Sequence, residues 1–141
     1  MSIPAVLAPV FVLIALTFFL NFWMARLRIS AVSSGSVHTR DIALRETNWP
    51  TRATQIGNAY HNQLEHPVLF YVLVAFALIT RQADFLFVVM SWIFVVFRVL
   101  HAYVFVTTNR VSRRFQVFAV AAVVLFLMWI IFAVRILTAG I

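Results

Sequence analysis

The sequence predicts an all-α integral membrane protein, a four-transmembrane-helix bundle in a single domain over residues 1–141. Hydrophobic residues make up 64% of the chain and charged residues 11%, against about 45–50% and about 25% in a typical soluble domain. The mean hydropathy of +0.99 agrees with this composition. Such a small number of polar groups cannot cover a surface exposed to water. We therefore expect membrane lipids around the helices. A soluble enzyme, a disordered chain and a coiled coil are excluded.

Four spans are expected, at about residues 3–25, 51–80, 84–108 and 114–137. The first and last are continuous apolar runs of about the 20 residues that cross a bilayer. The first has no basic segment before it, which favours a retained helix over a cleaved signal. The middle spans have apolar stretches of roughly 13 residues, too short to cross alone, so their polar neighbours must enter the membrane. Pro50 fits the first turn of the second span, and residues 33–36 are the predicted flexible part of the first loop.

The basic residues predict the orientation. All of them are arginines, and the net charge is +7. Most lie in or beside the first and third loops: Arg26, Arg28, Arg40, Arg45, Arg52, Arg110, Arg113 and Arg114. Cytoplasmic loops are enriched in arginine and lysine, so we expect these loops in the cytoplasm and both termini in the periplasm, in a bacterial inner membrane. This distribution accounts for the basic charge, and no nucleic-acid partner is expected.

Polar residues inside the middle spans indicate a buried cluster. The second span carries four polar side chains at intervals of three, four and three residues, which share one helix face: Gln55, Asn58, Asn62 and Glu65. On the third span, Arg98 and His101 also share a face. Their depths match in an antiparallel hairpin, so Glu65 and Arg98 are predicted to form an ion pair.

Two interpretations of this cluster remain open. Interhelical polar contacts can simply hold helices together. Charged groups at membrane depth also commonly mark a functional site, and here donors exceed acceptors, which favours an anionic ligand. No metal site is expected, because the chain has no cysteine and His61 and His66 lie on different helix faces.

The motifs resemble one known family. Asn62 and Glu65 form an N-x-x-E element followed by Pro67, Arg98 and His101 form an R-x-x-H element, and an arginine cluster precedes the last span. In this order, in a chain of this length, they resemble the MAPEG family of membrane-associated proteins in eicosanoid and glutathione metabolism, as a divergent bacterial-type member. The motifs cover about residues 50–115, and the four-span topology covers the whole chain.

The resemblance implies a homotrimer that binds glutathione between subunits, open to the cytoplasm. It assigns Asn62 and Glu65 to the amino end of glutathione, and Arg26, Arg98 and His101 to its carboxylate side. It makes Arg114 the catalytic arginine that faces the thiol, although Arg110 and Arg113 leave the register open. The implied reaction is attack of the thiolate on a lipophilic electrophile or hydroperoxide.

Three positions depart from the better-known enzymes of the family. His61 stands where they tend to carry arginine, Phe105 where they tend to carry tyrosine, and Phe115 where a hydroxyl residue would help to activate the thiol. A trimer of this family without transferase activity, with a binding or structural role, is therefore an alternative. A small multidrug-type transporter is a further one, although a Glu65 carboxylate neutralised by Arg98 would not exchange protons.

Overall fold

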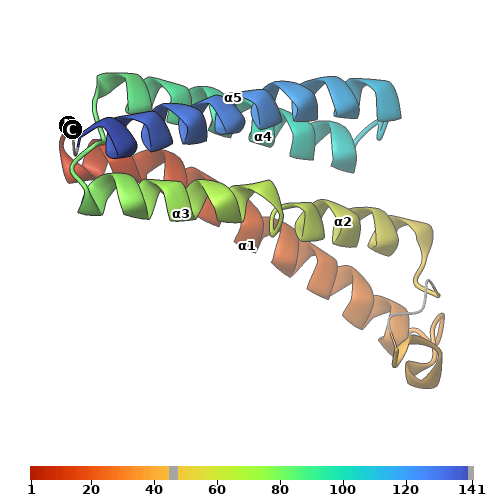
Figure 1. Ribbon diagram of the computed structural model, residues 1–141. Coiled ribbons are helices and arrows are strands. Elements are labelled where there is room, and N and C mark those ends of the chain that lie inside the picture. Colours follow the sequence, from red (N-terminus) through yellow and green to blue (C-terminus); the bar gives the residue numbers. More distant parts are fainter. Residues whose placement is uncertain (45–47, 140–141) are drawn as a thin grey trace.

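The computed structural model describes residues 1–44 and 48–139, and this part of the chain is helical apart from turns and short links (Figure 1). The helices follow in the order α1 Ile3–Ser33, the short 3-10 helix η1 Thr39–Ile42, α2 Thr51–Asn62, α3 His66–Ile79, α4 Phe85–Val106 and α5 Val111–Thr138. Arg45, one of the first-loop arginines counted above, lies outside the described residues. The beginning of α1 and the end of α5 lie at the same end of the bundle (Figure 1).

Four segments are long and apolar enough to cross a membrane: α1, the pair α2–α3 (Thr51–Ile79), α4 and α5. Their outer faces expose large apolar side chains, among them Phe11 and Phe22 of α1 and Phe126 of α5. Helices satisfy their own backbone hydrogen bonds, as a segment surrounded by lipid must. The predicted fold class, an all-α integral membrane protein with four spanning segments, is confirmed.

The second spanning segment is interrupted, where the sequence predicts one continuous helix. Residues 63–65 separate α2 from α3, and Glu65 has φ −96° and ψ −107°, outside the helical region. Pro67 lies in the first turn of α3. A proline ring clashes with the carbonyl four residues earlier, here that of Gln63, and has no N–H to donate. The helix therefore stops before the proline and begins again at it.

The first helix is longer than predicted, because α1 continues through residues 26–33 into the expected loop. It ends before Gly35, whose φ of +76° is a left-handed conformation that glycine adopts without steric cost. Of residues 33–36, which the sequence predicts to be flexible, Ser33 is the last residue of α1 and the other three form the turn that follows it. As a result Arg26 and Arg28 lie on α1 itself.

The interior contains two apolar clusters and one enclosed charge. Phe70 of α3 and Phe94 of α4 are fully buried, with ring centroids 4.9 Å apart, in the larger cluster. A smaller cluster includes Leu20 of α1 and Ala102 of α4. Arg98 lies on α4 between these residues and is 0% exposed. A guanidinium is thus enclosed in the protein at membrane depth, where an unpaired charge is costly.

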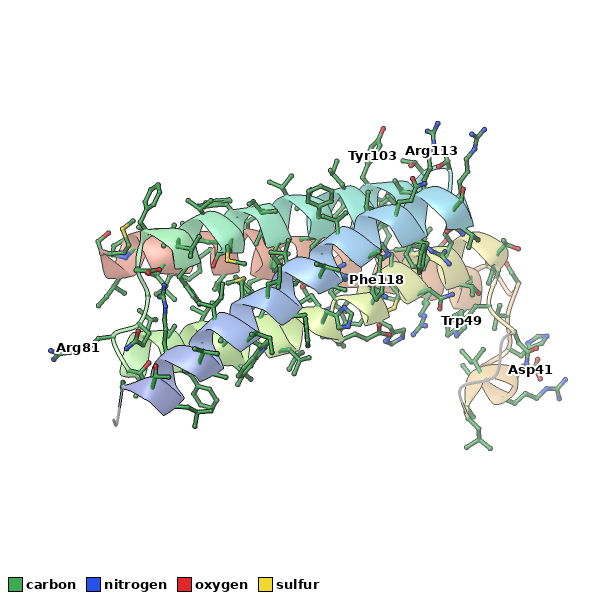
Figure 2. The ribbon with its side chains drawn as sticks, turned by 45° about the horizontal axis from the view of Figure 1, so that its top comes forward. Asp41, Trp49, Arg81, Tyr103, Arg113 and Phe118 are labelled. Atoms are coloured by element: carbon green, nitrogen blue, oxygen red, sulfur yellow. The ribbon has the colours of Figure 1, made fainter. Side chains whose placement is uncertain are left out.

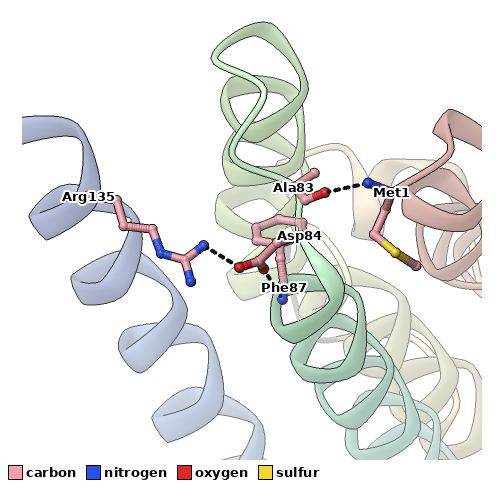
Figure 3. A network of polar contacts seen from close by, with 5 residues as sticks. All are labelled: Met1, Ala83, Asp84, Phe87 and Arg135. Atoms are coloured by element: carbon pink, nitrogen blue, oxygen red, sulfur yellow. Dashed lines mark hydrogen bonds and ion pairs between the residues drawn. The ribbon is translucent and has the colours of Figure 1, made fainter. Parts of the chain in front are cut away.

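Polar contacts tie the N-terminus and the end of α5 to the link between α3 and α4 (Figure 3). The Met1 ammonium donates to the Ala83 carbonyl at 3.3 Å. Asp84 caps α4 by accepting from the Phe87 N–H at 2.8 Å, and its other oxygen lies 2.8 Å from Arg135 Nη1 of α5. The Phe87 N–H above all, together with Arg135, lowers the pKa of the Asp84 carboxyl. This network closes the end of the bundle at which both termini lie.

Substitutions of Asp84 should distinguish how much the N-cap and the ion pair with Arg135 each contribute to stability. Alanine removes both, and loss of an N-cap costs about 0.5–2 kcal/mol. Asparagine keeps the cap acceptor and loses only a partly exposed pair, worth about 0–1 kcal/mol. In detergent at pH 7, we expect the melting temperature to be highest for the wild type, lower for Asp84→Asn and lowest for Asp84→Ala.

The pH dependence of the same variants tests the lowered pKa. The carboxylate stabilises the fold above its unfolded pKa, and this stabilisation disappears as the pH falls through the folded value, below 3.8. The difference between wild type and Asp84→Asn should therefore vanish in acid. Arg81→Asn serves as the control, because it removes an exposed charge at the same end and asparagine tolerates the left-handed φ of +57° at this position. A difference that persists in acid would contradict the assignment.

Candidate functional site

A cleft of about 420 Å³ opens between α2, α4 and α5, at the end of the bundle away from the termini. This volume lies within the usual range for small-molecule sites, about 300–1,000 Å³. Its lining residues come from α2 and the break after it, from the last turns of α4 and from the first turns of α5: Asn58, His61, Asn62, Glu65, His101, Phe105, Val111, Arg114, Phe115 and Phe118. Segments distant in sequence therefore form one concave surface.

Four of the six predicted site residues line this cleft: Asn62, Glu65, His101 and Arg114. Arg98 does not line it, because its side chain is fully buried. Arg26 lines a different hollow on α1, with Phe19, Phe22 and Trp23. Within one chain, the structure thus brings four of the predicted residues into the cleft, buries Arg98 outside its lining, and places Arg26 in a different hollow.

The predicted ion pair between Glu65 and Arg98 is wrong as a direct contact. Arg98 Nη2 donates to the backbone carbonyl of Asn62 at 2.9 Å and to its Oδ1 at 2.5 Å. Asn62 Nδ2 in turn donates to Glu65 Oε2 at 3.2 Å. The break after α2 explains the difference, because the last carbonyls of a helix need partners from outside it. Asn62 thus connects the buried arginine to an exposed glutamate.

Several buried polar atoms around this connection have no hydrogen-bond partner in the described part of the chain. They are Nε and Nη1 of Arg98, both side-chain polar atoms of Gln63, and Nδ1 of His66 and His101. Gln63 is 1% exposed. Sequence periodicity missed it, because it lies one residue beyond the polar stripe and is enclosed by the break.

Aromatic rings form one wall of the cleft. His66 of α3 stacks on Phe118 of α5 with centroids 4.9 Å apart, and His101 packs against both Phe118 and Phe105 at 5.7 Å. Phe118 was not among the predicted site residues. It stands four residues after Arg114, a spacing that puts both residues on one face of a helix. The sequence spacing could therefore have predicted that Phe118 lies beside Arg114. The cleft is therefore polar on the α2 side and largely apolar on the α5 side.

The structure distinguishes the three arginines near the start of α5. Arg114 lines the cleft, with its guanidinium carbon 4.3 Å from the centroid of the Phe105 ring. Its Nη1 donates to Asn109 Oδ1 at 2.5 Å. Arg110 is the N-cap residue, and Arg113 is exposed and points away from the helices (Figure 2). Asn109, in the link before α5, was missed because nothing in its sequence context marks it.

The cleft has charge of both signs. Glu65 provides an exposed carboxylate at the α2 break. On the other side Arg114 lies near the start of α5, whose first turn has no acidic residue and whose dipole adds positive potential. In the described residues, no three histidine, aspartate or glutamate side chains come together as a metal site. Such a cleft can bind a small molecule that carries both an ammonium and a carboxylate.

Substitutions at Arg98 and Glu65 should have unequal effects on stability. Arg98→Met leaves the Asn62 carbonyl and side chain without their charged donor, and such hydrogen bonds are worth about 1.5–3 kcal/mol. Glu65→Gln keeps an acceptor for Asn62 in an exposed position and should cost less than about 0.5 kcal/mol, as surface substitutions do. Thermal unfolding in detergent measures both. A direct buried pair would instead make Glu65→Gln cost about 3–5 kcal/mol.

Comparison with known proteins agrees with this architecture. The model of the MAPEG family matches residues 6–134, which include the two middle spanning segments, most of the first and the last, and every residue that lines the cleft. No curated protein and no solved structure matches the chain. Since the family model covers nearly the entire sequence, the chain belongs to the MAPEG family.

Proposed function

We propose that this protein binds glutathione in the cleft between α2, α4 and α5 and presents its thiolate to a lipophilic electrophile or hydroperoxide. Membership of the MAPEG family makes it a membrane protein of the glutathione- and eicosanoid-metabolism kind. The observation that carries the finer proposal is the cleft itself, in which Glu65 and Arg114 face one space of about 420 Å³. Glutathione has one ammonium and two carboxylates, and so requires charges of both signs.

The proposed roles follow from where each residue lies. Glu65, oriented by Asn62, accepts the ammonium of glutathione, since a carboxylate is a strong charge-assisted acceptor. Arg98 acts through Asn62, because its side chain is buried. His101 lines the inner wall between Phe105 and Phe118. Arg114 lies on the opposite side, where its guanidinium stabilises negative charge.

Glutathione supplies the nucleophile, and the protein supplies the charge that activates it. A free thiol has a pKa of about 8.5, and an adjacent guanidinium lowers it. The thiolate then forms a C–S bond while a leaving group departs, or breaks the O–O bond of a hydroperoxide. In the second case the sulfur takes the terminal oxygen and becomes a sulfenic acid, while the alkoxide takes up a proton and leaves as an alcohol. The thiol of a second glutathione then displaces water from the sulfenic acid and forms glutathione disulfide. Phe115 and Phe118 form the apolar side that a lipophilic substrate requires.

A homotrimer with intersubunit sites is part of the proposal. Arg26 lies outside the cleft of its own chain, in an aromatic hollow on α1. A neighbouring copy whose α1 packs beside the cleft would bring an Arg26 toward the carboxylate end of glutathione. The cleft is wide open in a single chain, so a second copy would also close it to water.

A binding protein without transferase activity is the second candidate, and the cleft contains a specific observation in its favour. Phe105 and Phe115 line it where hydroxyl groups would assist the thiol. Arg114 would then be the remaining activating group. The small multidrug-type transporter is set aside by the family match. Arg98 does not exclude such a transporter, because it contacts Asn62 and does not neutralise the Glu65 carboxylate directly.

Binding can be tested by thermal unfolding with added glutathione. A ligand at a hundredfold excess over its Kd stabilises the protein by about 2.7 kcal/mol. We expect the wild type to melt at a higher temperature with millimolar glutathione, and both Arg114→Ala and Glu65→Gln to show a smaller shift. Arg113→Ala removes the same charge from the outward face and should keep the full shift. A wild-type protein without any shift would rule out glutathione binding.

The arginines also support an orientation that can be tested. Arg40, Arg52 and Arg110 lie toward the end with the cleft, and Arg81 and Arg135 lie at the end with the termini. The positive-inside rule then places the cleft in the cytoplasm, where glutathione is synthesised, and both termini in the periplasm of a bacterial inner membrane. Reporters fused to either terminus should therefore be periplasmic, and one inserted at residues 34–36 cytoplasmic. The opposite pattern would reverse the proposed topology.

A further inference from the structure

Asn109 occupies a special position in the link between α4 and α5. Its φ of +49° is left-handed, and its N–H donates to the Val104 carbonyl at 2.8 Å, which ends α4. Its side-chain oxygen accepts from Arg114 Nη1. Glycine, asparagine and aspartate tolerate this backbone conformation best. Of these, asparagine alone offers an acceptor without a negative charge.

The second contact of Arg114 is also uncharged. Its guanidinium lies over the face of Phe105, 4.3 Å from the ring centroid, where the ring quadrupole attracts a cation. Phe105 is itself only 8% exposed and packs against His101. Among the described residues, no carboxylate lies within ion-pair distance of Arg114. The guanidinium is therefore fixed from two sides without losing its positive charge.

We propose that Asn109 and Phe105 are positioning residues that hold Arg114 in the cleft as a fixed cation that no acidic side chain neutralises. The inference rests on the proposed function, and extends it to how the thiol is activated without the hydroxyl groups absent at Phe105 and Phe115. A carboxylate at position 109 would hold the same guanidinium equally well but would cancel its field. Neutral partners keep the field directed at the bound thiol.

The test compares two substitutions that preserve the backbone at position 109. Asn109→Asp keeps an acceptor and adds a charge, and Asn109→Gly keeps the left-handed turn and removes the acceptor. The pKa of bound glutathione is measured from the ultraviolet absorbance of the thiolate during a pH titration. The rate of reaction with a chlorinated nitroarene is measured over the same pH range.

We expect Asn109→Asp to raise the thiol pKa by about one pH unit and to reduce the rate by up to about tenfold at pH values below the wild-type thiol pKa, since there the thiolate fraction falls tenfold for each unit. The rate should recover at high pH, where the thiol ionises without help. Asn109→Gly should show a smaller change in the same direction. Phe105→Leu should also raise the thiol pKa, and Phe105→Tyr, which keeps the ring, should not.

Two controls separate positioning from a general structural effect. Arg113→Ala should leave the thiol pKa and the pH profile at wild-type values. In an Arg114→Ala background, Asn109→Asp should have no further effect on either, because the residue through which it acts is gone. A loss of thermal stability alone would not change the pH profile.

The outcomes also distinguish this inference from the proposed function. If the wild type lowers the thiol pKa and Asn109→Asp has the same pH profile, the positioning role is overturned and the glutathione site stands. If the wild type binds glutathione without lowering its thiol pKa, the positioning role and the transferase activity are both overturned, and the binding protein remains. If the wild type does not bind glutathione at all, both proposals fail.

Discussion

The hydrogen bonds from Arg98 to Asn62 are the interaction on which the cleft depends. Pro67 prevents the second span from continuing as one helix, so the carbonyls at the end of α2 need donors from elsewhere. Arg98, fully buried on α4, donates to both the carbonyl and the side chain of Asn62. It thereby fixes the break, and the break places Glu65 at the edge of the cleft.

The charges of the cleft are held apart by uncharged groups. Asn62 stands between Arg98 and Glu65, and Asn109 and Phe105 hold Arg114 without a carboxylate. Had the arginines paired directly with acidic residues, their fields would largely cancel at short range. Amide and aromatic partners satisfy the geometry of a guanidinium and leave its charge available. The same chemistry thus stabilises the inside of the bundle and leaves a positive charge at the cleft.

The two ends of the bundle differ in how their polar groups are arranged. At the end with the termini, the charged groups of Met1, Asp84 and Arg135 bind one another or the nearby backbone (Figure 3). At the other end, Glu65 and Arg114 both line the cleft, and no ion pair joins them. A closed network stabilises the fold, whereas an open arrangement of opposite charges is what a zwitterionic ligand requires.

The sequence by itself determined the spans, the excess of arginine at one end, and the helix faces that carry Asn62, Glu65, Arg98 and His101. These properties depend on hydropathy and on the 3.6-residue period, which are local. Only the tertiary structure decided that Arg98 binds Asn62 and not Glu65, that Arg114 and not Arg113 enters the cleft, and that Asn109 contacts it. Helical spacing gives the face of a residue, but the partner across the interface depends on where a helix breaks and how two helices are rotated against each other. The break at Pro67 and the turn at Asn109 are local features, but the contact between Arg98 and Asn62 joins residues 36 positions apart on different helices, and no local pattern contains it.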